Sequence, residues 1–193
     1  MAKLILTSYG FNTKVGRKLI SRELKKDANL GDKKIFLFHE PYFSIEELLK
    51  TVCMELGFKQ ENIFFVGDSD SICRAREADY IYVTEGNTFE ILSLIRERGL
   101  EEPIKEAVKA GATYIGASAG AMLAGVDIKE ASCMDRNFSN LQNLASFGFF
   151  DGIILPHYTP KERERYILNS PGITEKYNAI YSVANDGILV LEV

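Results

Sequence analysis

The stretch Ala112-Thr113-Tyr114-Ile115-Gly116-Ala117-Ser118-Ala119-Gly120 joins a short apolar run directly to a turn of small residues. The apolar run is typical of a buried strand, and Gly-x-Ser-x-Gly is typical of a sharp turn from a strand into a helix. Such a turn pushes the serine oxygen out of the backbone and leaves the next amide, that of Ala119, free to donate to a bound carbonyl. We therefore predict that Ser118 is a nucleophile and Ala119 an oxyanion-hole donor. The alternative is a tight turn that only tolerates small residues.

Apolar runs and helical patterns alternate along most of the chain. Helical spacing predicts helices over residues 15–27, from Ser44 to Gly57, from near Asn87, over 101–110 and over 160–168. Apolar runs predict strands at 4–6, 35–38, 63–66, 81–83, 112–115, 153–155, 180–183 and 188–191. This alternation predicts an α/β fold with three layers, a mostly parallel sheet flanked by helices. The last two strands flank Asn185-Asp186-Gly187, so we expect a hairpin-type turn and a sheet that is mixed near its end.

Length and composition exclude several classes of protein. The chain has 193 residues and no linker or repeat, so we expect a single domain over residues 1–193. With 46% hydrophobic and 26% charged residues, it is not a disordered or fibrous chain. No apolar run approaches the ~20 residues that span a bilayer. The net charge of -4 also indicates that the chain lacks the overall positive charge typical of proteins that bind nucleic acid. We therefore expect neither a membrane nor a nucleic acid as partner.

Three cysteines, Cys53, Cys73 and Cys133, stand far apart without a Cys-x-x-Cys pattern. An odd number at long spacings fits a reducing compartment and argues against a structural zinc site. The first residues contain no signal-peptide core, so we expect a cytoplasmic protein. We also expect all three thiols to be buried as small hydrophobic residues.

A serine nucleophile needs a base, and the chain has only two histidines, His39 and His157. Each follows an apolar run, and the carboxyl ends of parallel strands line the active crevice of such folds. Either histidine could therefore reach Ser118, and we favour His157 because it follows the nucleophile segment directly. A purely structural histidine is the alternative.

A carboxylate is expected to orient the base, and three aspartates are candidates. Asp135 follows the Ser118 helix, Asp151 precedes the His157 strand, and Asp186 lies at a strand end. We favour Asp186, whose alternative role is that of an ordinary turn residue.

The loop Thr84-Glu85-Gly86-Asn87-Thr88-Phe89 follows another strand and opens a helix. Gly86 permits close approach of the backbone, so its amide is a candidate for the second oxyanion donor. Asn87 can bind substrate or simply cap the helix.

Three segments together resemble peptidase family S51: Gly86-Asn87-Thr88-Phe89, Gly116-Ala117-Ser118-Ala119-Gly120-Ala121 and Pro156-His157-Tyr158. Members of that family include the aspartyl dipeptidase peptidase E and the cyanophycinases. The resemblance implies a class I glutamine-amidotransferase-like (flavodoxin-like) fold with serine in place of cysteine. It also implies Ser118 as nucleophile, His157 as base, a third carboxylate near Asp186 or at Asp135, and oxyanion amides at Gly86 and Ala119.

The same resemblance implies that Asn87 belongs to the substrate pocket and that Arg163 receives the carboxylate of an N-terminal aspartate. Arg163 lies in an alternating charged stretch, so a solvated helix face is its alternative role. Peptidase E has glycine where Glu85 stands, and an extra negative charge at the pocket would disfavour an acidic substrate. The chain also ends at Val193, which makes it shorter than peptidase E.

These observations favour a cytoplasmic serine peptidase that hydrolyses short peptides through an acyl-enzyme on Ser118, without metal or cofactor. Dipeptides with N-terminal aspartate are the expected substrates, and the oligomeric state, monomer or homodimer, stays open. The alternatives are an amidase or esterase with the same serine and histidine, or a binding protein on this fold without catalysis. Covalent labelling of Ser118 by a serine reagent excludes the binding protein.

Overall fold

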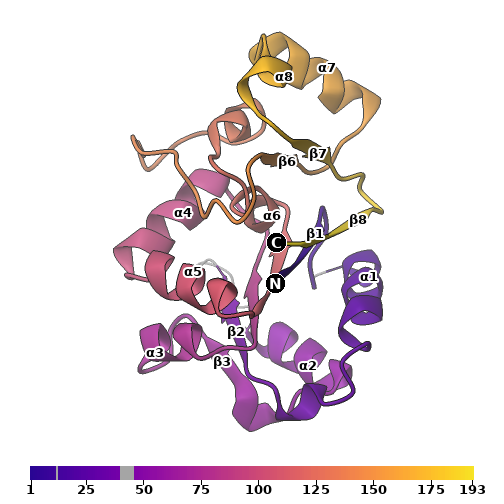
Figure 1. Cartoon of the computed structure of the whole chain (residues 1–193), viewed down its shortest axis with the longest axis vertical. Coiled ribbons are helices and arrows are strands. Elements are labelled where there is room, and N and C mark those ends of the chain that lie inside the picture. The colour runs from indigo at the N-terminus through magenta and orange to yellow at the C-terminus, as the bar shows by residue number, and fades with distance from the viewer. Residues whose placement is uncertain (12, 40–45) are drawn as a thin grey trace.

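The computed structural model of the chain describes residues 1–11, 13–39 and 46–193, and its centre is a six-stranded sheet in the order β3-β2-β4-β5-β1-β8 (Figure 1). The strands are β1 (Lys3–Thr7), β2 (Ile35–Phe38), β3 (Ile63–Phe65), β4 (Tyr80–Val83), β5 (Thr113–Ala117) and β8 (Ile188–Glu192). Neighbouring strands run parallel except β8, which pairs antiparallel with β1. The predicted mostly parallel sheet, mixed at one edge, is confirmed.

Helices cover both faces of this sheet. On one face lie α1 (Lys14–Leu24) and α2 (Glu46–Leu56); on the other lie α3 (Ser71–Arg76), α4 (Thr88–Glu97) and α5 (Glu101–Lys109) (Figure 1). Each face has its own apolar core, in which Ile20 of α1 and Leu49 of α2 pack on one side and Ile91 and Ile104 pack on the other. The chain therefore has the three layers that the alternating pattern predicts.

A second, two-stranded sheet pairs β6 (Ile153–Leu155) with β7 (Ile180–Ser182) in parallel. Between these strands the chain forms α7 (Pro160–Asn169) and α8 (Ile173–Lys176), at the top of Figure 1. The predicted hairpin of the last two strands is wrong, because β7 stays with β6 while β8 completes the open edge of β1. The turn at Asn185-Asp186-Gly187 thus carries the chain from one sheet to the other.

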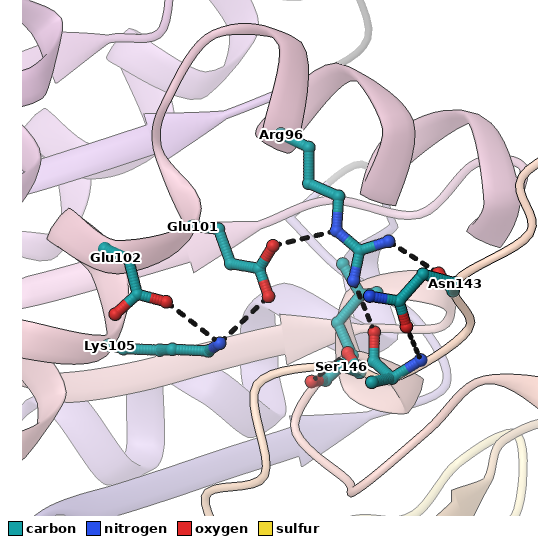
Figure 2. Close-up of polar contacts among 8 residues, drawn as sticks. Arg96, Glu101, Glu102, Lys105, Asn143 and Ser146 are labelled. Carbon is teal, nitrogen blue, oxygen red and sulfur yellow. Dashed lines mark hydrogen bonds and ion pairs between the residues drawn. The ribbon is translucent and has the colours of Figure 1, made fainter.

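The segment between Leu123 and β6 has little regular structure and is held by side chains. Figure 2 shows Arg96, at the end of α4, donating to the carbonyl oxygens of Asn143 at 2.5 Å and Ala145 at 2.7 Å while pairing with Glu101 at 2.8 Å. Lys105 joins the same carboxylate at 2.9 Å. This network fixes the segment to α4 and α5.

Most element boundaries follow the expected ones within a few residues. The predicted capping serine, Ser44, lies outside the described residues, and α2 is described from Glu46. Asn87 is confirmed as the residue where a helix begins, since its side-chain oxygen accepts from the amides of Phe89 and Glu90. In the described part of the chain, no helix is both long enough and apolar enough to cross a membrane.

The three cysteines are free thiols, but they do not share one environment. Cys53 and Cys133 are buried, and burial raises the pKa of the Cys53 thiol to about 12. Cys73 is exposed on α3, where its thiol lies 3.4 Å from the Glu77 carboxylate. The expectation that all three are buried is therefore wrong for Cys73, because α3 turns that side chain toward solvent.

Candidate active site

Ser118 stands at the turn between β5 and the short helix α6 (Ala119–Met122). Its backbone has φ 49° and ψ −108°, a region that a residue with a side chain rarely adopts. The amide of Ser118 donates to the carbonyl of Thr7 at the end of β1, at 2.8 Å. A strained backbone that surrounding contacts hold in place is a frequent feature of functional residues. The turn thus lifts the Ser118 hydroxyl above the carboxyl ends of the central strands.

The two glycines of the Gly-x-Ser-x-Gly pattern are required by close backbone contacts. A Cβ at Gly116 would stand 2.5 Å from the carbonyl oxygen of Gly120. A Cβ at Gly120 would stand 2.2 Å from the carbonyl oxygen of Val83 in β4. Both distances are shorter than non-bonded atoms tolerate. Glycine at these positions therefore lets the turn close against β4.

The Ser118 hydroxyl lies 2.8 Å from Nε2 of His157, which follows β6. Nδ1 of the same ring lies 2.9 Å from Oδ1 of Asn185. An amide oxygen only accepts hydrogen bonds, so Nδ1 carries the proton and Nε2 is left to accept from the serine. This is the tautomer that a general base acting on Ser118 requires.

Ser8 holds the backbone of His157 in place. Its buried hydroxyl accepts from the His157 amide at 2.8 Å and donates to the carbonyl of Val183 at 2.9 Å. His157 needs this support because its φ of 54° is unfavourable for a residue with a side chain. The ring of Tyr9 packs edge-on against the imidazole, with centroids 5.4 Å apart. The loop after β1 therefore orients the histidine, a role that no sequence pattern indicates.

The residue against Nδ1 is not the expected aspartate. Asp186 is exposed, and within the described part of the chain no hydrogen bond links it to His157. The side chain of Asn185, one residue earlier in the same turn, takes that place. The expectation of Asp186 is corrected here: it rested on the rule that a carboxylate orients the base, and here a neutral amide does so. The turn was found, but the residue was missed by one position.

The two other aspartates serve elsewhere. One carboxylate oxygen of Asp135 accepts from the Thr88 amide at 2.8 Å and from the Thr88 hydroxyl at 2.6 Å. Asp151 accepts from the side-chain amide of Asn178 at 2.6 Å, near the surface. Asp135 thus holds the start of α4, and with it the loop that carries Gly86.

Two backbone amides meet the requirements of an oxyanion hole. Within the described residues, neither the Gly86 amide nor the Ala119 amide is used by another hydrogen bond. Gly86 has φ 152° and is exposed, and Ala119 is the first residue of α6. The Gly120 amide donates to the carbonyl of Thr84 at 3.2 Å and so brings the two turns together. This placement is compatible with the expected pair of oxyanion donors.

Asn87 and Arg163 were expected in the substrate pocket. The Asn87 amide caps α4 through its oxygen and donates from its nitrogen to the Arg136 carbonyl at 2.9 Å. Its described contacts are those of a helix cap, and its place in the substrate pocket stays a prediction. Arg163 is exposed on α7, and no ion pair of the described residues engages it.

His39, the other histidine, is buried at the end of β2, where Nε2 lies 3.3 Å from the Glu46 carboxylate. The histidine beside Ser118 is His157, the one that the order of segments along the sequence favours. Among the described residues, no group of three or more His, Cys, Asp or Glu side chains could hold a metal ion.

Comparison with known proteins places this site in a family. The model of peptidase family S51 matches residues 38–192, most of the chain and all of the site from Glu85 to Asn185. The chain belongs to peptidase family S51. It is 39% identical over 113 residues to an uncharacterised peptidase of Listeria monocytogenes, covering 56% of this chain and 55% of that one. It is 42% identical over 91 residues to peptidase E of Citrobacter koseri, covering 47% of this chain and 39% of that one.

Two solved structures share the fold of this chain. A crystal structure of a peptidase E-type protein from Listeria monocytogenes superposes with a TM-score of 0.68 at 26% identity, covering 100% of this chain and 99% of that one. A peptidase from an acI-B1 actinobacterium has the same TM-score at 20% identity, covering 100% and 84%, and shows the likeness of fold alone. The expected family and fold class are thereby confirmed. The matched stretches span about half of the curated relatives' length or less.

Proposed function

We propose that this protein is a serine peptidase that hydrolyses short peptides through an acyl-enzyme on Ser118. The observation that carries the proposal is the 2.8 Å contact between the Ser118 hydroxyl and Nε2 of His157, with Asn185 fixing the tautomer on the other side of the ring. A serine on a strained turn, already paired with a neutral imidazole, is prepared for nucleophilic attack. Membership of family S51 supports the same reaction.

In this mechanism, the Ser118 oxygen attacks the scissile carbonyl carbon as its proton passes to Nε2 of His157. The carbonyl oxygen becomes an oxyanion, which the Gly86 and Ala119 amides stabilise by hydrogen bonds. The imidazolium then gives its proton to the leaving amine, and the C–N bond breaks. Water, activated by the neutral imidazole, hydrolyses the resulting ester and restores the serine.

N-terminal aspartate is the finer specificity that we propose for this site. Arg163 supports it, because its guanidinium is exposed on α7, the helix that follows the catalytic histidine. A guanidinium suits a carboxylate because its planar fork donates two parallel hydrogen bonds. We also propose a cytoplasmic location, which the three free thiols support.

The experiment combines labelling with turnover. A fluorophosphonate reagent should modify the purified protein at Ser118, located by peptide mass spectrometry, and Ser118→Ala should prevent the modification. Hydrolysis of Asp-Leu, Asn-Leu, Glu-Leu and Ala-Leu is then compared in the wild type and in Arg163→Ala. Absence of labelling at Ser118 would refute the serine mechanism.

Specificity is decided by the ratios of kcat/KM. A preference for Asp-Leu that Arg163→Ala lowers by about 10-fold or more would support the role of the guanidinium. Equal rates on Asp-Leu and Ala-Leu would refute the aspartyl preference. Cleavage of simple esters and amides but of none of the dipeptides would favour the amidase or esterase.

A further inference from the structure

Glu85 has a carboxyl group that the mechanism does not use. The residue stands between β4 and Gly86 and is only partly exposed. Its Oε2 atom is buried and has no hydrogen-bond partner among the described residues, a condition shared only by Oε1 of Glu90. A buried polar atom without a partner is rare in folded proteins and points to a missing partner.

This carboxyl group lies near the residue that precedes Ser118. A Cβ placed on Gly10 would stand 2.5 Å from Oε2 of Glu85 and 2.8 Å from Cβ of Ala117, the residue before Ser118. The Tyr82 hydroxyl reaches the same point, at 2.1 Å, and accepts from the Phe11 amide. The carboxyl group is therefore packed among the residues that carry the catalytic turn.

The carboxyl group of Glu85 takes part in no ion pair with the described residues. Burial raises the pKa of its carboxyl, while a hydrogen bond from its own backbone amide and, to a smaller extent, the nearby His157 lower it. Burying the Oε2 atom of a carboxylate without a donor costs more than an ordinary hydrogen bond gains. A cationic donor from a bound molecule would remove that cost.

We infer that Glu85 receives the α-ammonium group of the peptide substrate and so restricts the enzyme to the residue at a free N-terminus. The inference rests on the proposed function, because it needs the scissile carbonyl to face Ser118 and the Gly86 amide. In a peptide, the α-nitrogen stands only two bonds from that carbonyl carbon. Glu85 is bonded directly to the amide of Gly86, so adjacent residues contact the oxyanion and the ammonium. A lysine or arginine side chain would carry its charge several bonds further from the scissile bond.

This assignment removes the objection that Glu85 repels an acidic substrate. With the α-ammonium paired to Glu85, the local charge is balanced, and an aspartyl side chain remains free to extend toward α7. A peptide whose N-terminus is acetylated would leave the carboxyl group without its partner.

The experiment measures how fast two phosphonates modify Ser118. The first is the diphenyl ester of 1-aminoethylphosphonate, which carries a free amine, and the second is its N-acetyl derivative. A fluorophosphonate without an amine reports on the serine and histidine alone. Wild type, Glu85→Gln and Glu85→Gly are compared, with Glu90→Gln as the matched control because one carboxylate oxygen of Glu90, Oε1, is likewise buried without a described partner.

We expect the free amine to label the wild type about 10- to 100-fold faster than the acetylated reagent. Both Glu85 variants should bring that ratio close to one while the fluorophosphonate rate stays within a few fold of wild type. Glu90→Gln should keep the wild-type ratio.

Two results would overturn the inference while leaving the serine peptidase intact. One is a wild-type protein that the fluorophosphonate labels at Ser118 but that the free-amine phosphonate labels no faster than its N-acetyl derivative. Failure of both aminophosphonates to react counts as the same result. The other is a faster reaction of the free amine that persists in both Glu85 variants. If the pH dependence of fluorophosphonate labelling also changes in those variants, Glu85 acts on His157 and not on the substrate amine. No fluorophosphonate labelling at all would refute the proposed function itself.

Discussion

Replacing Asn185 by aspartate tests how this site works with a neutral residue behind the base. In the wild type, Nδ1–H of His157 donates to the Asn185 oxygen at 2.9 Å. An aspartate would accept the same hydrogen bond in almost the same volume and add a negative charge. The geometry and the tautomer would be preserved, so only the electrostatics would change.

The expected gain follows from the strength of the two hydrogen bonds. A neutral hydrogen bond contributes about 1 kcal/mol, and one to a charged group about 1.5–3 kcal/mol. The difference, about 0.5–2 kcal/mol, favours the imidazolium that forms as Ser118 loses its proton, and its upper half corresponds to about 10-fold in rate.

The assay is the pH dependence of fluorophosphonate labelling, which requires no knowledge of the substrate. Asn185→Asp should label about 10-fold faster on the alkaline plateau, and Asn185→Ala should label more slowly than wild type. Asp186→Asn, the matched change at the exposed neighbour, should leave the whole profile unchanged. If Asp186→Asn slows labelling while the Asn185 variants behave like wild type, the assignment of Asn185 is refuted.

Three further changes test the supports of the site. Asp135→Asn weakens a charge-assisted contact with the start of α4, so labelling should slow by about 10-fold with an unchanged pH dependence; a shifted pH dependence would mean that Asp135 acts on the histidine. Gly120→Ala places a Cβ 2.2 Å from a carbonyl oxygen of β4, so the free energy of unfolding should fall by about 1–3 kcal/mol or more. An unchanged midpoint of urea unfolding would contradict this tight contact. Ser8→Ala removes two hydrogen bonds at the His157 backbone, and we expect slower labelling, whereas a wild-type rate would show that the histidine is positioned without it.

Much of the fold was predictable because its signals are local. Continuous apolar runs predict the strands from Ile35 to Ala117, since strands buried on both faces need no polar side chains. The Gly-x-Ser-x-Gly turn was predictable because its pattern of small residues is local in the sequence, although the contact that requires Gly120 is made with β4. The pairing of the last strands was not, because Asn185-Asp186-Gly187 has the composition of a hairpin turn. The choice of partner depends on which sheet edge is open, and that is a property of the whole molecule.

The candidate site likewise combines residues that local patterns predict with residues that depend on the packing of the whole molecule. Ser118 and His157 each follow a buried strand, and residues at the carboxyl ends of strands line the crevice of such folds, so their meeting was predictable from order along the chain. That the two strands belong to different sheets was not predictable. Asn185 was missed because a general rule favours a carboxylate, although an amide oxygen satisfies the same ring nitrogen. Ser8 gave no signal, since its role arises only when β1 lies beside the end of β6. Glu85 was visible as a departure from peptidase E, but the burial of its oxygen depends on packing.

The proposed nucleophile and the proposed base follow strands of different sheets, Ser118 after β5 and His157 after β6. The described hydrogen bonds that join the two near the site include those of Ser8 to the His157 amide and the Val183 carbonyl. Separation of the small sheet from the large one would break the contact between Ser118 and His157, but Ile154 of β6 and Val183 after β7 are buried in the apolar core of the large sheet. We therefore expect the small sheet to open only together with that core. On heating, activity and the far-ultraviolet circular dichroism of the central helices should be lost over the same temperature range, and activity lost several degrees earlier would reveal a separate local opening.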